Sequence, residues 1–252
     1  MNRSMLKKEL TENLYDSKGL WMIVAVSLIF TTLCVLATTI KEVTAYSQTD
    51  ILQYALKAET LLTLLVCMTL GAACFVSERE NNTLESLLLT PVSKLSLTAS
   101  KYLGVLIVGV ILMLTATPYV LAISAGSGLW LTALALGFGS VGLLLVAFTA
   151  VSVILSVLME NSKASVLVSA LCLAVLAIPS IMSAIFQTSA FGRLVLATDP
   201  IVCAFDLAKN VLTGTATAAS ITGNLLPMII FAVIAVALML LVSKRVSLKG
   251  EK

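Results

Sequence analysis

The chain has 252 residues, of which 59% are hydrophobic and 12% are charged, and its formal net charge is +3 at neutral pH. Soluble domains are about 45–50% apolar and about 25% charged, so the composition excludes a water-soluble fold of this size. Histidine is absent, which excludes Ser-His-Asp triads and His-ligated metal sites, and no basic stripe with interleaved aromatic residues supports nucleic-acid binding. The composition therefore predicts an all-α integral membrane protein.

In chain order, the apolar residues of segment 1–19 recur at helical spacing among several lysines, which predicts an amphipathic helix lying in the membrane interface. Long apolar runs follow, each sufficient to cross a bilayer, at 20–40, 55–76, 102–122, 129–159, 164–186 and 225–242. We therefore expect a single transmembrane domain over 1–252 with six transmembrane helices.

The segment 187–224 is too mixed in composition for a span and too apolar for a free loop. We expect two short helices at 191–196 and 201–212, broken at Asp199-Pro200 and ended near Gly214. Such a pair is expected to be re-entrant, dipping into the outer leaflet where other parts of the protein cover its backbone.

The placement of basic residues predicts the orientation of the chain, because Lys and Arg accumulate on the cytoplasmic side of membrane proteins. With both termini cytoplasmic, 12 of the 16 basic residues lie inside. The four that lie outside are Lys41, Lys57, Arg193 and Lys209. We therefore expect a multi-pass protein of the inner (plasma) membrane with both termini in the cytoplasm.

Two charges fall within the second apolar run, and charges inside membranes are candidate functional groups. They are Lys57 and Glu59, and we favour the interpretation that both reach the nearby interface with their polar ends. Three glycines of the fourth run, Gly137, Gly139 and Gly142, predict close packing between helices. No run carries a chain of acidic or His residues near its centre, which weighs against ion-coupled transport.

The polar segment 78–91, between the second and third runs, predicts a short cytoplasmic helix. Asn82 can cap this helix, Glu85 follows three residues later as a capping-box partner, and Pro91 ends it. The apolar face of the helix consists of Leu84, Leu87 and Leu88. From the residues alone, two interpretations stay equally open. The face contacts lipid headgroups or a neighbouring helix of the same chain, or it docks onto a soluble partner.

A longer pattern runs through this segment, and it consists of Glu78-Arg79-Glu80, Thr83-Leu84-Glu85, Leu87-Leu88, Pro91 and then Lys101 at the next span. The pattern resembles the signature of type-2 ABC transporter permeases. Other features that fit this resemblance are the amphipathic N-terminal helix, the six spans, the outer segment and the short turn made of Glu160, Asn161, Ser162 and Lys163.

The resemblance implies a permease subunit that pairs with a second permease, an identical copy or a paralogue, and docks onto separate ATP-binding-cassette ATPase subunits. Residues 83–89 would be the coupling helix inserted into the ATPase, Glu78 to Glu80 would lie at the gate, and Glu160 to Lys163 would form a second, smaller contact. ATP and Mg would be bound by the ATPase, because this chain contains no GxxxxGK[ST] phosphate loop.

We therefore expect no catalytic residue, cofactor or metal in this chain, which would contact membrane lipid and the partner subunits only. The predicted function is ATP-driven export of an amphipathic or hydrophobic substrate. The alternatives are a non-transporting membrane anchor or scaffold for an ATPase complex, and an ion-coupled transporter.

Overall fold

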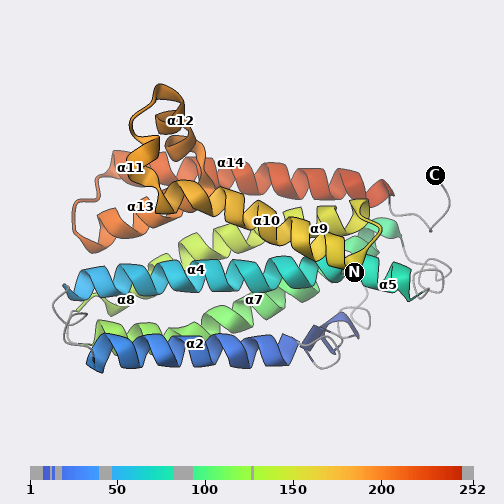
Figure 1. The fold of residues 1–252 in the computed structure, drawn as a ribbon, viewed down its shortest axis with the longest axis horizontal. Helices are drawn as coiled ribbons and strands as arrows, with labels where there is room; N and C mark the ends of the chain where they lie inside the picture. The colour runs from blue at the N-terminus through green and yellow to red at the C-terminus, as the bar shows by residue number, and fades with distance from the viewer. Residues whose placement is uncertain are drawn as a thin grey trace.

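A computed structural model describes residues 8–11, 13–14, 19–39, 47–81, 93–125 and 128–245 of the chain. All regular structure in these ranges is helical, and six of the helical segments are long and apolar enough to cross a membrane. The prediction of an all-α membrane protein is confirmed. The long helices run side by side, and the helical turn at 8–11 lies at the same end of the bundle as α5 (Val76–Glu80) and the end of α14 (Ala218–Val242) (Figure 1).

Several of the long helices begin before the apolar run that predicted them. The second, third and sixth are α4 (Gln48–Ala73), α7 (Lys94–Ser124) and α14, which begin about two turns earlier than expected. In each case a hydroxyl caps the first turn, because Ser47, Ser93 and Thr217 accept from backbone amides of that turn. Such a cap satisfies amides that have no partner within the helix, so polar residues ahead of the apolar run also become helical.

The first, fourth and fifth long segments are also helical, with local differences from the prediction. They are α2 (Gly19–Thr39), the series α8 (Trp130–Leu136), η2 (Gly137–Val141) and α9 (Gly142–Leu158), and α10 (Ser162–Ile181). A π-helical turn, η2, thus interrupts the fourth segment. The fifth helix ends at Ile181 rather than at 186, two residues after Pro179.

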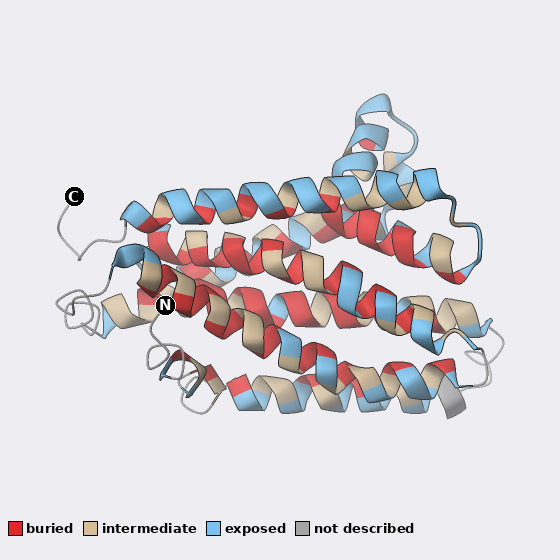
Figure 2. Ribbon diagram, turned by 180° about the vertical axis from the view of Figure 1, so that it is seen from behind, coloured by how far each residue is buried: buried red, intermediate tan, exposed pale blue. Residues whose placement is uncertain are grey.

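The helices α4 and α9 form the centre of the bundle. In their most apolar stretches 67% and 61% of the residues are buried, whereas the corresponding share in α2 is 17%. Figure 2 shows the buried residues gathered along the middle of the bundle and exposed residues along the outer helices. The exposed positions of the outer helices are largely Leu, Ile and Val, which suits contact with lipid or with another subunit.

The outer segment forms α11 (Ser183–Phe186), α12 (Ala190–Thr198) and α13 (Pro200–Leu212). The first two protrude from the bundle, whereas α13 packs against α14 and α4 (Figure 1). Asp199 separates α12 from α13, and its Oδ1 accepts from the amides of Ile201 (2.8 Å) and Val202 (3.2 Å). Burial raises the pKa of the Asp199 carboxyl, although these two hydrogen bonds act in the opposite direction. Gly214 ends the segment with a φ of 71°, which glycine adopts without strain.

Two of the three glycines of the fourth segment, Gly139 and Gly142, do not mark close packing, contrary to the prediction, whereas a Cβ added to Gly137 would lie 3.6 Å from Glu59 of α4. A Cβ added to Gly139 would meet nothing within 4 Å, and one added to Gly142 would lie 3.9 Å from its nearest neighbour. Helices α4 and α9 approach each other closely at another glycine. A Cβ added to Gly71 of α4 would clash with Ser152 of α9. The glycines at 137 and 139 belong instead to the π-helical turn η2.

Candidate functional site

The helix α4 ends in a turn at Cys74-Phe75, and α5 follows directly after it. The break leaves backbone amides without helical partners. Ser156 of α9 supplies one acceptor for both of them, because its Oγ accepts from the amides of Phe75 (2.8 Å) and Val76 (3.3 Å). The junction between the membrane helix and the cytoplasmic segment is therefore attached to the central helix α9.

Glu78 connects α5 to α7 and to the N-terminal helical turn. Its Oε1 accepts from the Lys101 ammonium at 2.6 Å, and the same ammonium donates to Glu9 Oε1 at 3.0 Å. The side chains of Lys101 and Glu9 are 2% and 5% exposed, so one buried cation is paired with two carboxylates. The ammonium also lies 5.4 Å from the centre of the Phe75 ring, within the range of a cation–π interaction.

Arg79 contacts the end of α9. Its Nη1 donates to the carbonyl oxygen of Met159 at 2.9 Å, and its Nη2 donates to that of Val157 at 3.4 Å. The last carbonyls of a helix lack helical partners and carry the negative end of its dipole. A guanidinium at this position therefore satisfies both the hydrogen-bonding and the charge requirement of the helix end.

Glu80 makes the complementary contact at the start of α10. Its Oε1 accepts from the backbone amide of Ser162 at 2.8 Å, while Asn161 Oδ1 accepts from the amide of Lys163 at 2.9 Å. The start of a helix presents free amides and partial positive charge, which favours a carboxylate. Three consecutive residues thus contact three different parts of the bundle, and we call Glu78, Arg79, Glu80, Lys101 and Glu9 the junction cluster.

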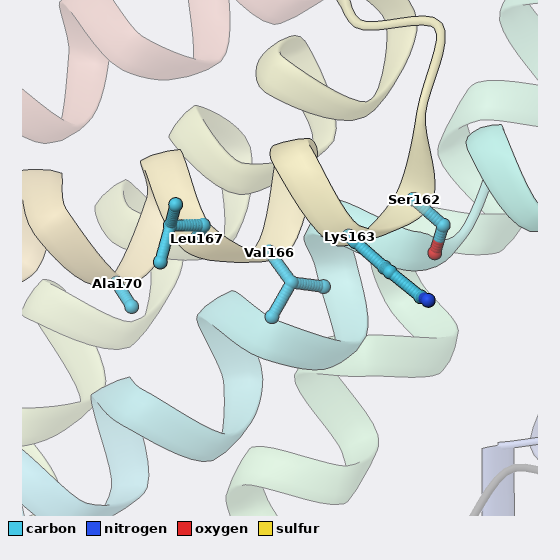
Figure 3. A pocket seen from close by; sticks show the side chains of 5 residues that line it. All are labelled: Ser162, Lys163, Val166, Leu167 and Ala170. Atoms are coloured by element: carbon cyan, nitrogen blue, oxygen red, sulfur yellow. The ribbon is translucent and has the colours of Figure 1, made fainter.

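The two cytoplasmic segments named from the sequence are adjacent in space. The turn from Glu160 to Lys163 joins α9 to α10 and lies against Arg79 and Glu80 through the contacts just described. Beside it, at the first turns of α10, lies a cleft of about 410 Å³ lined by Ser162, Lys163, Val166, Leu167 and Ala170 (Figure 3).

The remaining residues of the predicted coupling helix lie outside the described part of the chain. They are Thr83, Leu84, Glu85, Leu87, Leu88 and Pro91. The structure therefore describes how α5 enters this segment, through Glu78, Arg79 and Glu80.

Sequence reasoning missed Glu9 as a member of the junction cluster. A signal for it existed, because Glu9 lies one helical turn after Met5 and Leu6, on the apolar side of the N-terminal segment. A carboxylate on the buried side of an amphipathic helix needs a cation, and Lys101 is that cation.

The interpretation that both intramembrane charges reach the interface is wrong for Glu59. Its side chain points into the bundle and the residue is 4% exposed. Lys57, on another face of α4, lies 5.3 Å from the ring centre of Phe205 and 5.7 Å from that of Tyr54.

Comparison with known protein families decides the identity of this bundle. A family model described as "ABC-2 family transporter protein" matches residues 35–241, which is most of the chain. The chain belongs to the ABC-2 family of transporter proteins. Among curated proteins, none matches the chain.

Membership of the ABC-2 family confirms the resemblance seen in the signature around Glu78. The chain is a multi-pass membrane permease of an ABC transporter, the transmembrane part of such a machine and not its catalytic part. ABC-2 permeases work with an ABC ATPase in general, so the junction cluster of this permease lies next to the segment that is expected to meet that ATPase.

Proposed function

We propose that this permease exports an amphipathic or hydrophobic substrate, driven by a separate ATP-binding-cassette ATPase that holds ATP and Mg. It would pair with a second permease, an identical copy or a paralogue, in the inner (plasma) membrane with both termini cytoplasmic. The observation that supports this proposal is the junction cluster. It connects the segment leading into residues 82–92 to the end of α9, the start of α10, Lys101 of α7 and the N-terminal turn.

The physical reason is mechanical. Arg79 and Glu80 join α5 to the end of α9 and the start of α10 by charge-assisted hydrogen bonds. A displacement of α5 by a partner would therefore be passed to both helices. A bundle that is biased between two arrangements by the nucleotide state of the ATPase meets the requirement for driven transport.

The exposed apolar faces of the outer helices fit the rest of the proposal. Positions on α10 and α14, such as Leu167, Ile181 and Leu241, are more than half exposed. Such faces suit lipid or a second permease, and a pathway lined by apolar helices suits an apolar or amphipathic substrate better than a small ion.

The test uses the full-length tagged permease, extracted in mild detergent from its native membrane. Leu88→Asp places a charge on the predicted apolar face of the coupling helix, and we expect it to abolish co-purification of an ATP-binding-cassette ATPase. Ser86→Asp is the matched control, because it adds the same charge on the opposite face of that helix.

The two variants should be inserted in the membrane in equal amounts. If wild type co-purifies no such ATPase, the scaffold or ion-coupled alternatives take precedence. If Leu88→Asp retains the ATPase as well as Ser86→Asp does, the coupling-helix assignment is refuted.

A further inference from the structure

A buried carboxylate lies on α4, near the start of the apolar run 55–76. Glu59 is the twelfth residue of this helix, so it lies about 16 Å from the helix start at the helical rise of 1.5 Å per residue. The residue is 4% exposed, and the described part of the chain offers its carboxylate neither an ion pair nor a hydrogen bond. Lys57 does not serve as its partner, because its ammonium lies over Tyr54 and Phe205.

A second polar group without a partner lies one helical turn further along the same face. Thr63 is 1% exposed, and its Oγ1 makes no hydrogen bond to any described residue. Thr60, between them, differs in that its hydroxyl donates to the carbonyl of Leu56 at 2.7 Å. Two unsatisfied oxygen-bearing side chains thus project from positions i and i+4 into the bundle.

The wall facing Glu59 is the π-helical turn η2. A Cβ added to Gly137 would lie 3.6 and 3.7 Å from the two carboxylate oxygens, so this glycine presents only backbone to Glu59. Leu56 also lies at this point, because its side chain would be 3.8 Å from the same added Cβ. Single π-helical turns inside α-helices are frequent at functional sites.

An ionised carboxylate without a partner is costly at this depth, so Glu59 either carries a proton or is paired with a cation from outside the chain. We propose that Glu59 and Thr63 bind the ammonium group of a positively charged amphiphile.

The chemistry favours an ammonium over a metal ion. A primary ammonium has three donors, and the two residues at i and i+4 carry three oxygens: the two of Glu59 and the hydroxyl of Thr63. A Ca²⁺ or Mg²⁺ ion needs about six or more oxygen ligands, and the described residues contain no group of three or more His, Cys, Asp or Glu that would hold a metal. As a statement about cargo, this inference rests on the transporter function proposed above and names the substrate class.

The test is photo-labelling of the purified full-length permease in phosphatidylcholine nanodiscs, which carry no net surface charge. The probe is a dodecylamine with a diazirine in its chain, and the control probe is the alcohol with the same chain. In wild type we expect the amine to label the residues of α4, α8 and η2 around Glu59 at least tenfold more than the alcohol does.

Three variants sharpen the test. Glu59→Gln keeps the shape of the side chain and should reduce labelling by the amine at least tenfold. Thr63→Val removes one of three acceptors and should reduce it severalfold. Lys57→Gln is the matched control, a charge change two residues away on another face, and should leave labelling unchanged.

Equal labelling by amine and alcohol, or equal labelling of wild type and Glu59→Gln, would overturn the proposal. Loss of the wild-type signal on adding sodium chloride, but not N-methylglucamine chloride, would assign the site to an inorganic cation and overturn it too. The nanodiscs contain no ATPase, so this result and the co-purification result can fail separately.

Discussion

The junction cluster makes a quantitative prediction about Lys101. Replacing it by Met keeps most of the side-chain volume but removes the cation shared by Glu9 and Glu78, whose side chains are 5% and 12% exposed. Removing one partner of a buried ion pair typically costs about 3–5 kcal/mol, because an uncompensated charge is left behind. At about 2–4 °C per kcal/mol for a chain of this size, Lys101→Met should lower the unfolding midpoint by about 6–20 °C.

The assay is thermal unfolding of the purified permease in nanodiscs, followed by intrinsic tryptophan fluorescence. The control variant is Lys163→Met, which removes an exposed cation and should change stability by no more than about 0.5 kcal/mol. A fall of the Lys101→Met midpoint no larger than that of Lys163→Met would refute the view that the cluster is a buried ion network.

A rescue experiment tests the same reasoning from the other side. When Lys101→Met is combined with Glu9→Gln and Glu78→Gln, no buried charge of the cluster is left without a partner. Neutral replacement of a buried ion network is often close to neutral for stability, so the triple variant should regain most of the lost midpoint. A triple variant as unstable as Lys101→Met would show that packing, and not charge, explains the loss.

Two further predictions concern helix ends and packing, with the same unfolding assay. Asp199→Ala removes the cap of α13 and should cost about 0.5–2 kcal/mol, whereas Asp199→Asn keeps the acceptor and should be at least as stable as wild type. Because burial raises the pKa of Asp199 in the folded state above its usual value of about 3.9, the charged form is penalised, and this advantage of Asn should shrink as the pH falls through the raised pKa and be gone below about 4. Gly71→Ala should cost about 1–3 kcal/mol, since its Cβ would clash with Ser152, whereas Gly139→Ala meets open space and should be tolerated. Equal effects of the two alanines, or an Asn variant as unstable as Ala, would contradict these assignments.

The spans were predictable from the sequence because a helix that crosses the bilayer needs an apolar run of about 20 residues, regardless of which other helices it contacts. Their starts were not, because hydropathy ignores hydroxyl caps such as that of Ser47, which extend the helix into polar residues. The motif residues Glu78, Arg79 and Glu80 were predictable from their pattern. Their partners were not, since the contacts of Lys101 with Glu9 and of Arg79 with Met159 join parts of the chain that only the tertiary fold brings together.

The burial of Glu59 was predictable in principle. It occupies the same helical stripe as Leu52, Leu56 and Thr63, at spacings of four, three and four residues, and the whole stripe faces the bundle. The position of Glu59 near the end of the apolar run, taken alone, predicts that its carboxylate reaches the membrane interface. That prediction ignores the buried stripe. The π-helical turn opposite it had no such signal, because the glycines of η2 also suit ordinary close packing.

The two polar features of the bundle lie on one continuous element. Glu59 and Glu78 are nineteen positions apart, or about 28 Å along a helix, and only the turn at Cys74-Phe75 interrupts the path between them. The amides freed by that turn donate to Ser156 of α9, so α5 is attached to the central helix as well as to α4. If the ATPase displaces residues 82–92, the same displacement reaches the wall around Glu59 through α4 on one side and through α9 and η2 on the other. Because interiors are close-packed and shift between discrete arrangements, a movement of these two elements would change the surroundings of the Glu59 carboxylate between them.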